Sequence, residues 1–453
     1  MTSPNEPLDA GAARDAAQFA FPTTSEIVEA WPVLGPEERR RALATLSRPE
    51  AEDVFLTLST HEQTALILDL PAEERRMWLR LLAPDDAADV LQEAPLEERP
   101  GLLALLDPTT RSAVTGLLVY EEDQAGGLMN PHYAHLRPDM TVTEAISYLQ
   151  RFARAHRDGI YYAYVLDEDR RLMGTVSYRE LFAALPHQRI ADIMRTECVT
   201  VAENLDQEEV SRLFAAHHYL ALPVIDAEGR MKGVVTIDDV VDVVHEEATE
   251  DIQKIGGSEA LDAPYLAIGF GRMVRKRGGW LAALFIGEML TATAMGRYQD
   301  EIARAVVLAL FVPLIISSGG NSGSQASTLV IRAMALGELG LRDWWRVIRR
   351  ELASGVALGA LLATIGLVRI LVWQRIFHVY GDHVGLIAAT VGISLVGVVT
   401  FGTLAGSMLP LLLRRLGFDP ASASAPFVAT LVDVTGLVIY FSVASVVLRG
   451  TLL

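Results

Sequence analysis

The sequence has little of what builds disulfides, cysteine–metal sites or an export signal. Cys198 is the only cysteine among 453 residues, so an intrachain disulfide and a cysteine-based zinc site are both excluded. The opening residues, MTSPNEPLDAGAARD, carry no basic segment and no apolar run, so we expect no signal peptide. There is no Gly-x4-Gly-Lys-Ser/Thr loop and no nucleophile with a matched base. We therefore expect neither an ATP-driven pump of that type nor an enzyme.

Basic residues are scarce in the first part of the chain and acidic residues are scarce in the second. Residues 1–271 hold 23 Lys+Arg and 48 Asp+Glu, a net charge of −25. Residues 272–453 hold 16 Lys+Arg and 9 Asp+Glu, a net charge of +7. The mean hydropathy is nevertheless positive, at +0.26. The sequence thus predicts an acidic soluble part and a membrane part, which excludes an ordinary cytosolic enzyme, a disordered protein and a nucleic-acid-binding soluble part.

Five apolar stretches in the second part are long enough to cross a bilayer, which takes about 20 helical residues. They lie near 280–297, 302–330, 352–373, 384–412 and 427–448. We expect Gly and Pro to interrupt the second and the fourth. Eleven basic residues flank the spans on one side and five on the other. The basic side is expected to be cytoplasmic, which places the soluble part in the cytoplasm and the C-terminus outside.

A polar stretch, SSGGNSGSQAS at 317–327, lies within the second span. Its glycines are expected to weaken the helix, while Asn321, Ser324 and Gln325 bring polar groups to membrane depth. Such groups are tolerated only against protein or a water-filled cavity, which favours a pore lining. A packing face of small residues between helices is the alternative.

Two acidic residues also lie within the spans. Asp433 follows Pro426 by seven residues, about 10 Å into the last span at 1.5 Å per residue. A carboxylate there is costly unless it faces a cavity or a cation, and it suits a hard cation. Pairing with a basic residue of another span, or protonation, is the alternative. Glu288, early in the first span, either lines the pore or pairs with an arginine at the cytoplasmic edge.

Residues 23–127 are expected to form an acidic superhelix of short helices, after a disordered tail over 1–22. Prolines recur at positions 36, 49, 71, 84, 95 and 108, and acidic residues often follow them. Proline in the first turn beside acidic residues is typical of a helix start. The leucines between the prolines would supply a continuous buried stripe.

A repeat with an offset of 59 residues occupies 128–241. Asp167, Gly174 and Glu180 of the first copy match Asp226, Gly233 and Asp239 of the second. Each copy is expected to form a strand, a turn, a strand and a helix that begins at a capping box, preceded by a helix at 141–155 or 206–217. The repeat resembles a tandem pair of CBS domains. This resemblance implies that Thr236 and Asp239 face the ribose of an adenine nucleotide such as ATP. A capping role explains these two residues equally well. Tyr219 either stacks on the base or belongs to the core.

Four motifs in this order of parts resemble the MgtE family of magnesium channels and transporters: EEDQAGGLM at 121–129, EATEDI at 247–252, GGNSGSQ at 319–325, and DP at 419–420 followed by ATLVDVTGL at 429–437. The expected fold is multidomain, with an all-α superhelical N-terminal domain, an α/β tandem CBS pair, a long connecting or plug helix over 242–271, and a five-span α-helical pore domain over 272–453. The resemblance implies a homodimer with the pore between the second and fifth spans. The carboxylate of Asp433, assisted by the carbonyl of Ala429, would bind Mg²⁺ there.

The resemblance further implies cytosolic Mg²⁺ sites that close the pore when occupied. The candidate ligands are Asp53, Asp85, Asp89, Glu208, Asp239, Asp242, Glu247, Glu250 and Asp251, with Asp419 at the contact with the membrane domain. The charge of −25 supports this, because bridging divalent ions would remove the repulsion that opposes close packing. Ala425, Ser324 and His218 depart from the family pattern and weaken side-chain assistance at their sites.

The expected function is therefore Mg²⁺ uptake through the cell inner membrane, gated by cytosolic Mg²⁺. Other functions remain open at this point. They are the transport of Mn²⁺ or Co²⁺, a CBS-regulated anion channel or organic-cation carrier, and a membrane-tethered nucleotide sensor that conducts nothing. An anion pathway would require basic residues or helix N-termini at the midplane, where this chain has acidic residues.

Overall fold

The computed structural model describes residues 23–31, 34–155, 161–261, 265, 268–378, 380 and 383–451. The tail predicted over 1–22 lies outside the described residues. The chain divides into two compact units, Met1–His245 and Glu246–Leu453, and each is described by itself.

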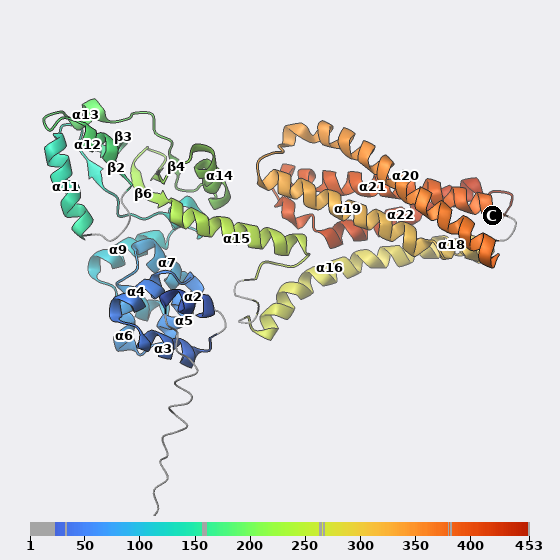
Figure 1. Ribbon diagram of the computed structural model, residues 1–453, viewed down its shortest axis with the longest axis horizontal. Helices are drawn as coiled ribbons and strands as arrows, with labels where there is room; N and C mark the ends of the chain where they lie inside the picture. Colours follow the sequence, from blue (N-terminus) through green and yellow to red (C-terminus); the bar gives the residue numbers. More distant parts are fainter. Residues whose placement is uncertain are drawn as a thin grey trace, which may run out of the picture. The chain divides into compact units, whose positions relative to one another are not determined.

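The first unit begins with an array of short helices (Figure 1). They are α2 (Thr24–Ala30), α3 (Pro36–Thr45), α4 (Arg48–Leu56), α5 (Thr60–Asp69), α6 (Ala72–Leu79), α7 (Pro84–Glu93), α8 (Arg99–Leu105), α9 (Pro108–Leu117) and α10 (Ala125–Leu128). Five of the six prolines lie at helix starts as predicted, and Pro95 lies in the turn before α8. Arginines early in α6 and α8 donate to the last carbonyls of the preceding helix, as Arg75 does to Leu70 (2.9 Å) and Arg99 to Ala94 (2.9 Å). These bonds satisfy helix ends that would otherwise be unpaired and connect neighbouring helices.

The two CBS repeats form two three-stranded sheets with the predicted 59-residue register. The first contains β1 (His135–Leu136), α11 (Val142–Ala155), β2 (Tyr162–Leu166), β3 (Leu172–Ser177), α12 (Tyr178–Ala183) and α13 (Ile190–Ile193). The second contains β4 (Val201–Ala202), α14 (Gln207–His217), β5 (Ala221–Ile225) and β6 (Met231–Thr236). In each sheet the middle strand pairs parallel with the first strand and antiparallel with the last. Side chains of the helical array and of the second repeat share one hydrophobic core.

The connecting helix differs from its predicted bounds. Helix α15 (Ile237–Ile255) begins directly after β6, five residues earlier than predicted, and it ends well before residue 271. Gly257 follows with a φ of +75°, a backbone conformation that residues with a side chain rarely adopt. Because α15 begins at Ile237, its first turn is the capping turn of the second repeat.

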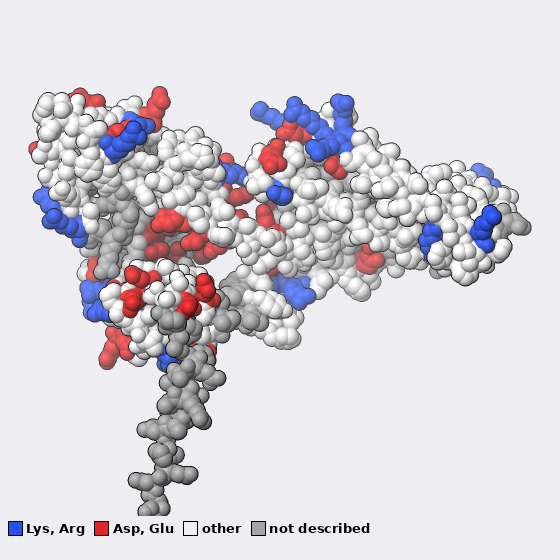
Figure 2. Space-filling view, in the orientation of Figure 1, with Lys and Arg blue, Asp and Glu red and all other residues white. Residues whose placement is uncertain are grey.

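Within its described residues, the second unit contains five helical spans long and apolar enough to cross a membrane, as predicted. Its elements are α16 (Phe270–Arg297), α17 (Gln299–Arg304), α18 (Val306–Ala309), α19 (Val312–Ala335), η2 (Leu341–Asp343), α20 (Trp344–Phe377), α21 (Val384–Arg415), η3 (Pro420–Ser422) and α22 (Ala425–Val447). Exposed arginines gather over η2 and the start of α20 (Figure 2).

The predicted interruption of the fourth span is wrong. The second span is interrupted at 310–311, between α18 and α19, and not at its glycines. Helix α19 runs unbroken through 317–327, and α21 contains Pro410 without a break. The glycines instead allow a close crossing, because a Cβ on Gly402 or Gly406 would collide with the backbone of Gly319 or Gly323. The packing face of small residues thus exists, and it lies towards α21.

Candidate functional site

A cavity of about 360 Å³ lies beside Asp433, between α16, α19 and α22. Among the predicted pore residues, Asn321, Ser324, Ala429 and Asp433 line it. Gln325 does not line it and is exposed. The polar stretch of α19 therefore presents Gly319 and Gly323 to α21, and Gly320 with part of its polar face to this cavity.

Two contacts hold α16 against α22 on one side of the cavity. The indole Nε1 of Trp280 donates to Ser424 Oγ (3.3 Å) near the start of α22. Two turns further along, a Cβ on Gly287 would approach Thr430 Cγ2 to 2.9 Å, so only glycine fits there without a shift. The next residue, Glu288, consequently lines the same cavity as Asp433, and the charges of the two carboxylates interact.

Serine side chains hold the start of α22 against α19. Ser324 Oγ donates to the carbonyl of Ala425 (3.1 Å), and the buried Ser327 Oγ donates to that of Ala423 (2.7 Å). Ser424 caps α22 by accepting from Phe427 N (3.3 Å). Ser324 and Ala425 are thus bonded to each other, and the Ser324 hydroxyl has a structural partner besides its place on the cavity.

The cavity is negatively charged. Among the described residues, no Lys or Arg forms an ion pair with Asp433 or Glu288. Asp433 is half-buried, and a carboxylate in a membrane span is stable only beside a cation, a proton or water. The arrangement therefore suits a cation and would repel an anion.

In the first unit, predicted regulatory acids of α7 and α15 lie close together. Figure 2 shows acidic side chains on the face where α7 and the start of α15 lie in Figure 1. Asp85 is buried, and its carboxylate accepts from Asn130 Nδ2 (3.2 Å). Burial raises the pKa of Asp85 well above its usual range, and the charges of Asp86, Asp239 and Asp89 add to the effect.

Asp239 belongs to the same acidic group. Burial and the charges of Asp238 and Asp86 raise its pKa to about 7, against the opposing hydrogen bonds from Thr236. Sequence reasoning missed Asp86 and Asp238, although each is adjacent to a predicted acid. The group is electrostatically unfavourable when all its members are ionised, which is an arrangement that a divalent cation would relieve.

The other predicted regulatory acids are more scattered. Asp53 is exposed on α4, Glu208 forms an ion pair with Arg212 on α14, and Asp242 lies one turn beyond Asp239. In the second unit, Glu247, Glu250 and Asp251 lie on α15, and Glu250 pairs with Lys254. No group of three or more His, Cys, Asp or Glu side chains in the described ranges is arranged to hold a metal ion by itself.

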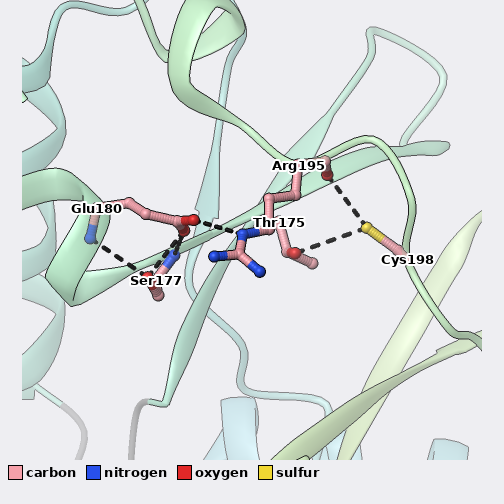
Figure 3. A network of polar contacts seen from close by, with 5 residues as sticks. All are labelled: Thr175, Ser177, Glu180, Arg195 and Cys198. Atoms are coloured by element: carbon pink, nitrogen blue, oxygen red, sulfur yellow. Dashed lines mark hydrogen bonds and ion pairs between the residues drawn. The ribbon is translucent and has the colours of Figure 1, made fainter.

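The CBS pair contains a second cavity, of about 310 Å³. Its wall carries a polar network, drawn in Figure 3, in which Ser177 Oγ donates to Glu180 (2.8 Å) and Arg195 pairs with the same carboxylate. The Cys198 thiol bonds to Thr175 Oγ1 (3.6 Å) and to the Arg195 carbonyl (3.3 Å). Cys198 thus belongs to the cavity wall.

The predicted nucleotide residues do not meet in one cavity. Tyr219 lines the larger cavity, together with Ser177 and Glu180, which occupy in the first repeat the positions of Thr236 and Asp239. Thr236 lines a separate cavity of about 20 Å³, too small for a nucleotide, and its hydroxyl donates to Asp239 (2.6 Å). The capping role of this pair is therefore observed, whereas the nucleotide-sized space lies beside the matching residues of the first repeat.

Family models match three successive parts of the chain. The MgtE intracellular N domain matches residues 23–123, the CBS domain matches 125–187 and 190–246, and MgtE, described as a divalent cation transporter, matches 312–443. The magnesium transporter MgtE of Thermus thermophilus is 42% identical over 446 residues, which cover 98% of this chain and 96% of the relative. The chain belongs to the MgtE family. It is accordingly a multi-pass membrane transporter with soluble MgtE N and CBS domains.

The chain is similar to further proteins over different shares of its length. The magnesium transporter MgtE of Bacillus subtilis is 30% identical over 411 residues, 90% of this chain and 89% of the relative. Inosine-5′-monophosphate dehydrogenases, such as that of Aquifex aeolicus (28% identity), match only 27% of this MgtE chain and 24% of their own length. A crystal structure of the cytosolic domain of the Mg²⁺ channel MgtE in complex with ATP aligns with 52% of this chain and 95% of its own, with 42% identity and a TM-score of 0.46.

Proposed function

We propose that this chain is a Mg²⁺-selective channel or transporter of the cell inner membrane and that it acts as a homodimer. Its soluble domains would be cytoplasmic and its C-terminus outside. The observation that carries the proposal is the cavity at Asp433, where a carboxylate without a basic partner among the described residues shares the lining with Asn321 and Ala429. The relative with 42% identity over nearly the full length is a magnesium transporter.

The chemistry of the cavity supports a divalent ion. Mg²⁺ sheds its water reluctantly and prefers one or two carboxylates with several retained waters. A space of about 360 Å³ accommodates an ion together with part of its hydration shell. A monovalent ion at the same place would gain about half the Coulomb energy.

Gating is proposed to follow from the acidic groups of the soluble domains. Mg²⁺ at Asp85, Asp89 and Asp239 would remove their mutual repulsion and favour the compact state. Asp53, Glu208, Asp242, Glu247, Glu250 and Asp251, with Asp419, complete the proposed regulatory set. At low cytosolic Mg²⁺ the repulsion would return, loosen the domains and free the pore.

ATP is proposed as a ligand of the cavity in the CBS pair. Tyr162 and Tyr219 offer aromatic faces for the base, Glu180 offers an acceptor for ribose hydroxyls, and Arg179 offers charge for phosphate. This cavity also supports the second candidate function, a nucleotide sensor that conducts nothing. Transport of Mn²⁺ or Co²⁺ is the third candidate, because carboxylates bind these ions as well.

Mg²⁺ flux into proteoliposomes that contain the full chain tests the proposal. Flux should occur at low Mg²⁺ on the side of the soluble domains, should fall as Mg²⁺ on that side rises, and should be lost in Asp433→Asn. Glu338→Asn, at an exposed loop position, is the matched control and should conduct normally. Undiminished flux in Asp433→Asn would reject the proposed pathway, and no flux of any divalent ion in the unchanged chain would favour the sensor.

A further inference from the structure

A second carboxylate shares the cavity with Asp433. Glu288 is on α16, a helix of a different span, and its carboxyl group lines the same cavity as Asp433, close enough for the two charges to interact. The contacts of Trp280 with Ser424 and of Gly287 with Thr430 fix the register of α16 on α22, so this meeting is set by packing along two turns. Two unpaired carboxylates held together in this way repel each other unless a cation or a proton lies between them.

A third side chain on the same wall lacks a partner. Thr291, about one turn beyond Glu288, lines the cavity, and its Oγ1 is buried without a hydrogen-bond partner among the described residues. A buried hydroxyl without a partner is costly, and an ion-bound water would satisfy it. The hydroxyl therefore points independently to a hydrated occupant on the α16 side of the cavity.

We infer that Glu288 is a second carboxylate of the ion site, so that each chain presents two carboxylates to a hydrated divalent cation, with Thr291 bonded to a water of that ion. The inference rests on the proposed function of the Asp433 cavity. A dication beside these carboxylates gains about twice the Coulomb energy of a monovalent ion at the same place. Glu288 is thus a determinant of divalent affinity and of the preference for divalent over monovalent ions.

A purely structural role for Glu288 predicts different behaviour from its variants. Glu288→Gln retains the length of the side chain, and its amide can donate to Asp433, but the charge is lost. Glu288→Asp retains the charge but shortens the side chain by one methylene. A ligand role therefore makes the aspartate variant resemble the unchanged chain more closely, whereas a packing role favours the glutamine variant.

The test is Mg²⁺ flux into proteoliposomes as a function of Mg²⁺ concentration, with Na⁺ flux measured in parallel. We expect Glu288→Gln to raise the half-saturating Mg²⁺ concentration at least five-fold and to increase Na⁺ flux relative to Mg²⁺ flux. Glu288→Asp should show a smaller change, and Glu338→Gln should show none. Size-exclusion profiles and melting temperatures of each variant in detergent verify that the chain is folded.

Other outcomes separate this inference from the proposed function. A half-saturating concentration in Glu288→Gln within two-fold of the unchanged chain, with flux lost in Asp433→Asn, overturns the role of Glu288 and leaves the pathway intact. A glutamine variant that behaves better than the aspartate variant also overturns it, in favour of packing. If Glu288→Gln does not fold, the flux through Glu288→Asp decides. A ligand role requires that Glu288→Asp conduct with a preference for divalent ions. Loss of that preference in Glu288→Asp overturns the ligand role.

Discussion

Lys254, in the last turn of α15, donates from Nζ to Asp419 Oδ2 across 2.6 Å, while Glu250 pairs with the same ammonium group. Asp419 also caps η3 by accepting from Ala421 N (2.8 Å). Burial lowers the pKa of Lys254, but the hydrogen bonds and charges of Asp419 and Glu250 outweigh it and raise the pKa above its ordinary value. The predicted metal ligand Asp419 thus has a lysine as its partner, and a Mg²⁺ ion at Asp419 would have to compete with this ammonium group.

The ion pair between Lys254 and Asp419 should couple the connecting helix to the segment before α22. In a double-mutant cycle of Lys254→Met and Asp419→Asn, we expect a coupling energy of about 1 kcal/mol in thermal unfolding of the full chain in detergent. The expected value is modest because the two side chains are 28% and 35% exposed and solvent screens the pair. The matched cycle on Arg346 and Asp343, where the arginine is 88% exposed, should give a value near zero. Additive effects at Lys254 and Asp419 would contradict the coupling.

The raised pKa of Asp239 makes the contact between α7 and α15 sensitive to pH when divalent ions are absent. A carboxyl whose pKa is raised by folding binds its proton more tightly in the folded state, so folding is favoured at low pH. That contribution is lost as the pH rises from about 4, the ordinary value, to about 7 in the folded chain. In EDTA, hydrogen exchange in α7 and the first turn of α15, corrected for intrinsic rates, should therefore be faster at pH 7.5 than at pH 5.5.

Asp239→Asn should flatten this pH dependence and slow exchange at pH 7.5, because the amide carries no charge. Asp139→Asn, whose side chain is 64% exposed in the unchanged chain, is the control and should leave the dependence intact. Mg²⁺ should slow exchange at pH 7.5 in the unchanged chain and less so in Asp239→Asn. Protection that increases with pH in EDTA would show that the acids of this group do not repel each other as described.

The crossing of α19 and α21 should tolerate no side chain at Gly402. We expect Gly402→Ala to destabilise the membrane unit by about 1 to 3 kcal/mol, because the new methyl group meets the backbone of Gly319. Gly385→Ala in the same helix meets nothing within 4 Å, and it should be neutral or stabilising by up to about 1 kcal/mol. Melting temperatures in detergent measure both, and equal shifts would argue against the close crossing.

Local patterns in the sequence predicted much of the fold. Proline with acidic neighbours marked the starts of α3, α4, α7 and α9, and the 59-residue offset fixed both CBS hairpins. Hydropathy located the five spans, because a membrane helix needs a long apolar run that is visible without knowledge of its neighbours. These features depend on residues close together in the chain, and a single sequence records them directly.

Features that join distant segments were harder to predict. Glu288 was recognised as an acid in a span, but nothing nearby in sequence indicates that α16 lies along α22, 145 residues later. The glycines of 317–327 were expected to weaken α19, because helix propensity counts them as unfavourable, whereas their contacts with Gly402 and Gly406 offset that cost. The ion pair between Lys254 and Asp419 could not be predicted from the sequence, since a lysine among acids on a helix ordinarily pairs with its helical neighbours in solvent.

The most direct measurement of the central claim is the position of a divalent ion in the membrane unit. Crystals of the full chain grown with Mn²⁺ in place of Mg²⁺ would reveal the ion by anomalous scattering. We expect a peak in the cavity between α16, α19 and α22, at coordinating or water-bridged distance from Asp433. Manganese peaks elsewhere in the chain with this cavity empty, or a basic side chain bonded to Asp433, would contradict it.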